Sequence, residues 1–263
     1  MITLYDFKTK LPGTTLSPFV WKIRLALNIK GLEHQTHWIS FSKIEQQLKE
    51  LGLPPSSTTP NNFGTYHTVP GIYDSFTDTK VSDSRAILKY LDETYPNTPQ
   101  LLSQPNGDPQ LEAFVAEAFA PAWGTPASMI RLLWKVIAPK IVLEGLEGED
   151  TAKYRARVEA ANGMSVEEWM ENEAARGQCL AKAREAFDVA DAWLQSTRKI
   201  HGGVWALGEA VTLADIELGT VLAFACSILG KDDRLWKQII GEWNDSRWGA
   251  LWDQMGQYTR VVM

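Results

Sequence analysis

The sequence predicts a chain of two architectures, an α/β part over residues 1–97 followed by an all-α part over residues 98–263. Three observations support this division. The first hundred residues mix strand-like and helix-like segments, whereas later residues show almost only helical spacing of apolar side chains. Between them lies "NTPQLLSQPNGDPQ" (97–110), whose prolines, glycine and lack of periodicity are typical of a linker. A chain of 263 residues is long enough to bury a sizeable core.

The α/β part opens with a strand, a helix and a second strand. "ITLYDF" (2–7) is short and bounded by polar residues, and "EHQTHWISF" (33–41) is rich in β-favouring residues, so both are predicted strands. The helix between them is predicted to end at Gly31. Its apolar residues lie on or near one face: Phe19, Val20, Ile23, Leu27 and Ile29.

The rest of this part completes a β-α-β-α-β-β-α order. A short helix or turn is predicted over 42–52, a loop over 54–67, a hairpin from "VPGIYD" (69–74) and "TKVSDS" (79–84), and a helix over 84–96. Because the first two strands flank a helix, we expect them to be parallel and joined by a right-handed crossover. The order is that of a thioredoxin-like domain.

The second part is predicted to be helical, with two marked helix starts. Helices are expected over 111–123 and 127–143, and one long helix over 165–195. Ser165 and Glu168 have the spacing of a capping box, in which each side chain binds the other residue's backbone amide. Thr212 and Asp215 repeat that spacing, so we expect a helix to begin there as well.

Composition excludes several classes of function. The net charge of −6 argues against a nucleic-acid binder, which needs a basic face. No apolar run approaches membrane-spanning length and no signal-peptide pattern is visible, so we expect a cytoplasmic protein without a membrane partner. The four histidines and two cysteines show no metal-ligand spacing, so no metal site is predicted and Cys179 and Cys226 are expected to be buried free thiols.

Ser17 is the first candidate for chemistry. Ser17-Pro18 fits a helix start, with serine as the N-cap and proline as the first helical residue. One interpretation is that Ser17 only caps the helix. The other is that its hydroxyl and the helix N-terminus stabilise a bound thiolate, since helix N-termini favour anions. Lowering a thiol pKa of ~8.5 by about 2 units corresponds to roughly 2.7 kcal/mol and would leave the thiol mostly ionised at neutral pH.

Two further pairs have a structural and a functional interpretation. Val69-Pro70 is either an ordinary turn or a cis peptide bond that holds the Val69 backbone outward to pair with an extended peptide. Asp83-Ser84 is either a helix cap or a site for an α-amino-acid end, with Asp83 taking the ammonium and Ser84 the carboxylate.

Together these segments resemble the soluble glutathione transferases. The resemblance is carried, in order, by "LSPFVWKIRLAL" (16–27), "TVPGI" (68–72), "VSDSRAILKYLD" (81–92) and "TLADIELG" (212–219), and it covers essentially the whole chain. The stretch 14–32, the long loop 54–67 and the long second half look most like the etherase-related group, especially the fungal-specific FuA class.

The resemblance implies a set of glutathione-binding residues. Ser17 matches the residue that contacts the glutathione sulfur in serine-type members, and Val69, before a cis Pro70, matches the position that pairs with the cysteinyl part. Asp83 and Ser84 match the pair that binds the γ-glutamyl end, although many relatives carry Glu or Gln where this chain has Asp83. A basic residue often holds the glycyl carboxylate, and both Lys43 and His67 are candidates.

The resemblance also implies a hydrophobic ligand site formed by the helical domain, between the two domains. The aromatic and apolar residues proposed to line it are Phe19, Trp21, Phe119, Trp123, Met129 and Trp134. Glutathione would attack aromatic halides, isothiocyanates, peroxides or aryl ethers there, as in detoxification. Two alternatives stay open: a ligandin that binds aromatic polyphenols with little turnover, and a non-catalytic interaction module. The resemblance implies a homodimer.

Overall fold

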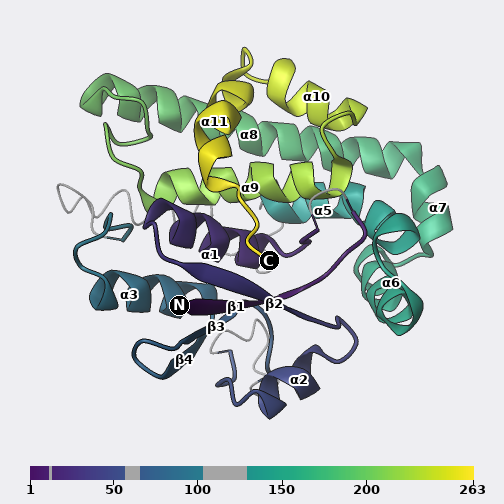
Figure 1. The fold of residues 1–263 in the computed structure, drawn as a ribbon. Helices are drawn as coiled ribbons and strands as arrows, with labels where there is room; N and C mark the ends of the chain where they lie inside the picture. Colours follow the sequence, from purple (N-terminus) through teal and green to yellow (C-terminus); the bar gives the residue numbers. More distant parts are fainter. Residues whose placement is uncertain (12–13, 57–65, 103–128) are drawn as a thin grey trace.

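The computed structural model describes residues 1–11, 14–56, 66–102 and 129–263 (Figure 1). The first half contains a four-stranded sheet of order β2-β1-β3-β4. Its strands are β1 (Ile2–Phe7), β2 (His34–Ile39), β3 (Gly71–Asp74) and β4 (Thr79–Ser82). Its helices are α1 (Pro18–Ile29), α2 (Ile44–Glu50) and α3 (Ser84–Thr94). The predicted β-α-β-α-β-β-α order and the thioredoxin-like fold of this half are confirmed.

The strand directions also follow the prediction. β1 and β2 are parallel, with Ile2 opposite His34, whereas β3 and β4 form an antiparallel hairpin. β3 runs antiparallel to β1 and joins the two halves of the sheet. Helices α1 and α3 pack against each other, and α2 lies on the other side of the sheet (Figure 1). Gly31 adopts a positive φ of 65° directly after α1, which is the left-handed conformation that ends many helices.

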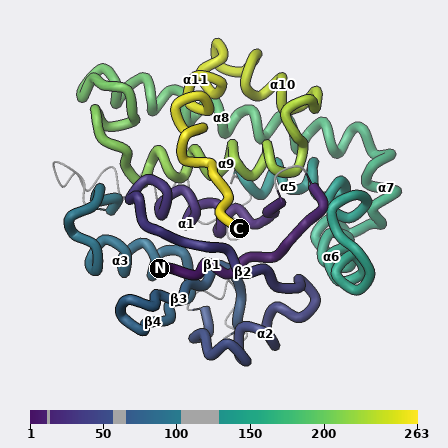
Figure 2. Tube along the Cα trace, viewed as in Figure 1, coloured from purple at the N-terminus to yellow at the C-terminus, as the bar shows by residue number. Residues whose placement is uncertain are grey.

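The described remainder of the chain is helical, as predicted. It consists of α5 (Met129–Lys140), a π-helical turn η1 (Ile141–Gly145), α6 (Gly148–Asn162), α7 (Val166–Glu171), α8 (Glu173–His201), α9 (Leu213–Leu229), α10 (Arg234–Gly241), α11 (Arg247–Met255) and a final 3₁₀ turn η2 (Gly256–Tyr258). Figure 2 shows α8 and α9 above the sheet domain, with the C-terminal tail returning toward the sheet, and α5 packs against both helices. The predicted helix 111–123 and most of the linker lie outside the described residues.

One predicted helix is in fact two. The long helix expected over 165–195 is broken at Asn172, which separates α7 from α8. The Asn172 side chain accepts a hydrogen bond from the amide of Ala175, so it starts a new helix instead of continuing the old one. Both predicted capping boxes are present, at Ser165/Glu168 and at Thr212/Asp215.

The two halves share a buried interface between α1 and α9. The Trp21 indole donates a hydrogen bond of 2.9 Å to Ser227, and Lys22 forms a buried ion pair of 2.6 Å with Glu217. Gly219 of α9 lies beside the same interface, where a Cβ would meet Met255 of α11 at 2.5 Å but Leu25 of α1 only at 3.4 Å, so the missing side chain makes room for Met255. α1 therefore serves both the sheet domain and the helical domain.

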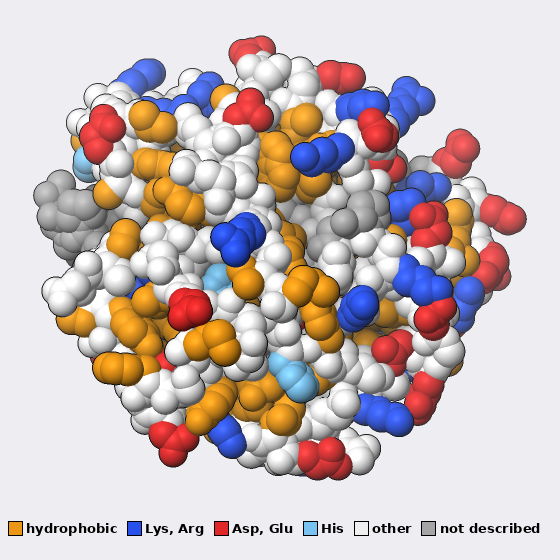
Figure 3. All heavy atoms as spheres, in the orientation of Figure 1, with side chains coloured by type: hydrophobic (Ala, Val, Ile, Leu, Met, Phe, Trp, Pro, Cys, Tyr) orange, Lys and Arg blue, Asp and Glu red, His pale blue; other side chains and the backbone are white. Residues whose placement is uncertain are grey.

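The surface carries charges of both signs, and the two cysteines are free thiols. Figure 3 shows acidic and basic side chains interspersed on the face that it presents, with hydrophobic side chains between them. Cys179 and Cys226 are free but half-buried, so the prediction of full burial is wrong. Among the described residues, no helix is both long and apolar enough to cross a membrane.

Candidate active site

The register of the sheet brings four turns together at one end of it. Gly71, the first residue of β3, lies opposite Tyr5 of β1 and opposite Ser82, the last residue of β4. Ile39, the last residue of β2, pairs with Phe7, the last residue of β1. The turns that follow β1, β2 and β4 and the one that precedes β3 are therefore neighbours. These turns and the helix starts after them contain all the predicted glutathione-binding residues: Ser17, Lys43, His67, Val69, Pro70, Asp83 and Ser84.

Ser17 caps α1, and its hydroxyl donates to no acceptor among the described residues. It has extended backbone angles, and its Oγ accepts a hydrogen bond of 3.3 Å from the amide of Val20. A hydroxyl group can accept and donate at once, so the Ser17 proton remains available for an anion. The side chain is buried beside the N-terminus of a twelve-residue helix, where anions are favoured. The capping and the thiolate-binding interpretations of Ser17 are therefore compatible.

A buried polar cluster holds the turn that leads to Ser17. The Asp6 carboxylate accepts hydrogen bonds from the hydroxyl of Thr15 and, at 3.0 Å, from the guanidinium of Arg24. Arg24 is fully buried and also donates to Thr36 at 2.8 Å. Burial raises the pKa of Asp6 to about 6, and the charge of Arg24 opposes that rise. The cluster thus ties β1 and α1 to the residue two positions before Ser17, a connection that sequence reasoning missed.

The two other predicted pairs have unusual backbone conformations. The Val69-Pro70 peptide bond is cis, as the functional interpretation expected. Among the described residues, no loop or side-chain hydrogen bond involves the Val69 amide or carbonyl. Asp83 has a φ of +78°, which is uncommon for a residue other than glycine. Its Oδ1 caps α3 by accepting from the amides of Arg85 and Ala86 at 3.0 and 3.2 Å.

Both basic candidates for the glycyl carboxylate lie at the same end of the sheet. Lys43 is exposed and precedes α2 as its N-cap residue. His67 is half-buried, and its Nδ1 has no hydrogen-bond partner among the described residues. The pKa of Glu45, in the first turn of α2, is lowered chiefly by its hydrogen bond to Lys49, with a smaller contribution from His67. His67 therefore lies within electrostatic range of Glu45, in the first turn of α2.

The proposed wall residues divide into three groups. Trp21, Met129 and Trp134 are buried, with exposed fractions of 4%, 3% and 3%. The Trp21 indole donates to Ser227 across the interface between the two halves, and the Trp134 indole donates to the hydroxyl of Tyr154 at 2.7 Å within the helical half, so both indoles serve as packing residues.

Only Phe19 is half-buried among the described wall residues. It is the second residue of α1, and Lys22 Nζ lies 5.8 Å from its ring centroid. Phe119 and Trp123 lie outside the described residues. Phe19 is therefore the described wall residue best placed to meet a ligand beside Ser17.

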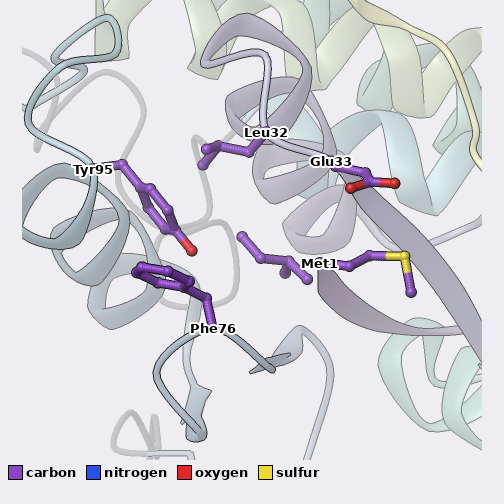
Figure 4. Close-up of a pocket in the computed structure, with 6 residues that line it drawn as sticks. Met1, Leu32, Glu33, Phe76 and Tyr95 are labelled. Atoms are coloured by element: carbon purple, nitrogen blue, oxygen red, sulfur yellow. The ribbon is translucent and has the colours of Figure 1, made fainter.

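A separate hollow lies at the opposite end of the sheet. It has a volume of about 230 Å³ and is lined by Met1, Ile2, Leu32, Glu33, Phe76 and Tyr95 (Figure 4). These residues lie where β1 and β2 begin, after β3 ends and at the C-terminal end of α3, so this hollow is not part of the candidate active site. Within the described ranges, no group of three or more His, Cys, Asp or Glu side chains is placed to hold a metal ion.

Comparison with protein families agrees with this geometry. The family model described as "Glutathione S-transferase, N-terminal domain" matches residues 11–99, and "Glutathione S-transferase, C-terminal domain" matches residues 115–258. The chain belongs to the glutathione S-transferase family. It is thus a glutathione transferase, with the fold class predicted from the sequence.

Several solved glutathione transferases are similar over nearly the whole chain. A glutathione S-transferase of Ceriporiopsis subvermispora, solved in complex with glutathione, is 31% identical with a TM-score of 0.84 and covers 99% of this chain and 98% of its own. Glutathione transferase GSTFuA2 of Phanerochaete chrysosporium is 26% identical with a TM-score of 0.82, over 99% of this chain and 98% of its own. In a comparison of sequences alone, Glutathione S-transferase 1 of Dianthus caryophyllus is 23% identical over 86% of this chain and 80% of its own length.

Proposed function

We propose that this transferase is of the serine type, with Ser17 stabilising the thiolate of bound glutathione. The observation that supports this most is the hydroxyl of Ser17, which donates to no acceptor within the described ranges and lies at the start of α1, at the same end of the sheet as the cis Val69-Pro70 bond. The cap fixes Oγ while leaving its proton to a sulfur anion. The partial positive charge of the helix start adds to the same stabilisation.

The other turns bind the rest of the tripeptide in this proposal. The Val69 backbone pairs with the cysteinyl residue, and Asp83 with Ser84 takes the γ-glutamyl end. A basic side chain, from Lys43 or His67, takes the glycyl carboxylate. Glutathione as the co-substrate is supported by two similar Ceriporiopsis enzymes, 31% and 28% identical to this chain, which were solved in complex with glutathione.

The proposed reaction is attack of the thiolate sulfur on a hydrophobic electrophile next to Phe19. With an aromatic halide, a carbon–sulfur bond forms and the halide leaves. With an isothiocyanate, the sulfur adds to the central carbon and the nitrogen takes up a proton. Peroxides and aryl ethers belong to the same proposed substrate range.

The finer classification and the assembly are also proposals. The similarity to GSTFuA2 supports membership of the FuA class, and the etherase-related grouping is proposed from the sequence resemblance alone. We place the boundary between the glutathione-binding domain and the helical domain at 97/98, and we propose a homodimer, which size-exclusion chromatography with light scattering tests.

Turnover of benzyl isothiocyanate with glutathione tests the proposed mechanism. Ser17→Ala should lower kcat/KM by tenfold or more, about 1.4 kcal/mol of lost transition-state stabilisation. Ser17→Thr, which keeps a hydroxyl and a good cap, should retain more activity than Ser17→Ala. Equal turnover in wild type and Ser17→Ala would remove Ser17 from the mechanism. A ligandin would instead show little turnover and be stabilised thermally by aromatic compounds without glutathione.

A further inference from the structure

Residues 145–154 of the helical half hold two of the turns at the candidate active site. The first is the turn between β1 and Ser17. There the Lys10 amide donates a hydrogen bond of 2.9 Å to the carbonyl of Gly145, and the Lys10 side chain forms an ion pair with Glu147. The second is the turn that follows β2, and the contacts to it are more extensive.

Asp150, in the first turn of α6, binds three consecutive residues of that second turn. Its Oδ1 accepts from the Ser40 hydroxyl at 2.6 Å and from the Ser42 amide at 2.8 Å. Its Oδ2 accepts from the Phe41 amide at 3.1 Å. Burial opposes the charge, but these hydrogen bonds outweigh it and lower the pKa of Asp150. The group that holds the turn is therefore a carboxylate at neutral pH.

The next turn of α6 contacts the same segment. Lys153 donates a hydrogen bond of 2.7 Å to the carbonyl of Ser42. The ring of Tyr154 packs edge-on against Phe41, with centroids 5.1 Å apart, and both rings are buried. Donor, acceptor and apolar contacts from one helix face thus fix the position of Ser40–Ser42 relative to the helical half.

Lys43 is the residue that this arrangement orients. Its amide donates a hydrogen bond of 3.2 Å to the carbonyl of Ser40, which closes the turn that Asp150 holds. Lys43 is also the N-cap residue of α2 at the candidate active site, and it is exposed. We propose that Asp150 is a positioning residue for glutathione binding, acting through the Ser40–Lys43 turn to place Lys43 against the glycyl carboxylate. This inference rests on the proposed function, and it selects Lys43 over His67.

The predicted effect is on the affinity for glutathione and not on the chemical step. The glycyl carboxylate is remote from the reacting sulfur, so its contact contributes equally to the ground state and the transition state. Asp150→Ala should therefore raise KM for glutathione about tenfold, a typical coupling within one hydrogen-bond network, while kcat stays within about twofold.

Steady-state kinetics with glutathione and benzyl isothiocyanate test this, at a temperature well below the unfolding midpoint of each variant. Glu149→Ala is the matched control, because Glu149 is the exposed neighbour in the same helical turn and loses the same charge. It should leave both constants unchanged. In a Lys43→Met background, Asp150→Ala should have little further effect on KM. Glutathione esterified at its glycyl carboxylate should show the same KM in wild type and Asp150→Ala.

The outcomes separate this inference from the proposed function. If the wild type turns over and Ser17→Ala is impaired, but Asp150→Ala matches Glu149→Ala, only the positioning role of Asp150 is wrong. A fall in kcat without a change in KM, or a rise in KM that persists undiminished with Lys43→Met, would also overturn it. If wild type and Ser17→Ala turn over equally, the proposed function itself fails.

Discussion

Asp92→Asn should cost this protein a large fraction of its stability, because Asp92 joins three segments at the junction of the two halves. Its carboxylate binds the buried ammonium of Lys30 at 2.6 Å and accepts from the amides of Leu101 and Leu102 at 2.9 and 2.8 Å. Leu101 in turn accepts through its carbonyl from the amide of Leu213, where α9 begins. Removing the charge leaves the Lys30 ammonium in a buried site without a counter-ion.

The magnitude follows from the burial of the pair. The Lys30 side chain is 0% exposed and that of Asp92 is 8% exposed. Breaking such a pair by removing one partner costs about 3–5 kcal/mol. Asparagine keeps one acceptor oxygen for the amides, so we expect the lower end, about 3 kcal/mol. With a urea m value of about 3 kcal/mol/M, the unfolding midpoint should fall by about 1 M.

Glu93→Gln provides the control within the same helix. Glu93 is the next residue along α3 and pairs with Lys89 at 3.7 Å, with side chains 66% and 69% exposed. Such an exposed pair contributes less than about 0.5 kcal/mol. Urea unfolding followed by tryptophan fluorescence compares the two variants. If Asp92→Asn unfolds within about 1 kcal/mol of Glu93→Gln, the buried pair does not stabilise the junction as argued.

Two further predictions concern the helical half. Asp215→Ala should lower the free energy of unfolding by about 2–4 kcal/mol, measured by urea unfolding, because the amide and hydroxyl of Thr212 lose their buried acceptor; a loss below about 1 kcal/mol would show that this capping box is dispensable. Gly249→Ala should cost about 1–3 kcal/mol, measured as a lowered Tm, because its Cβ would lie 2.5 Å from the carbonyl oxygen of Ile240. Gly241→Ala, in the neighbouring helix and with open space around it, should leave Tm unchanged or raise it, and equal effects of the two alanines would contradict the packing argument.

Local sequence signals predicted the elements and the helix starts. The capping boxes at Ser165/Glu168 and Thr212/Asp215 are complete within four residues, so nothing distant was needed to find them. The hairpin after Pro70 and the cap at Ser17 are local in the same sense. The break at Asn172 was missed because helical periodicity continues through it, and only the side-chain cap marks the new start.

Contacts between distant residues could not be predicted in this way. Lys22 and Arg24 lie on α1, which was predicted to have one apolar face, and Lys30 is its C-cap residue, yet all three are buried. Each pairs with a carboxylate from another element, respectively Glu217, Asp6 and Asp92. The hydrogen bonds from the Ser40–Ser42 turn to Asp150 of α6 likewise join residues more than a hundred positions apart in the sequence.

The predicted lining of the hydrophobic ligand site was also beyond what the sequence alone could decide. Trp21 and Trp134 are of the residue type that lines aromatic ligand pockets. Their indole groups instead donate buried hydrogen bonds to Ser227 and Tyr154. A large aromatic side chain fits a core and a pocket equally well, so the sequence alone did not separate the two.

Ser17 and the start of α1 are proposed to stabilise the thiolate of bound glutathione. The most direct test is the thiol pKa of glutathione in the complex. The thiolate absorbs in the ultraviolet, so a pH titration of the difference spectrum gives that pKa for wild type and Ser17→Ala. In the wild type we expect a pKa about 2 units below the ~8.5 of a free thiol, and in Ser17→Ala the pKa should return most of the way to that value. An unshifted pKa in the wild type, or the same pKa in both proteins, would contradict the proposed stabilisation.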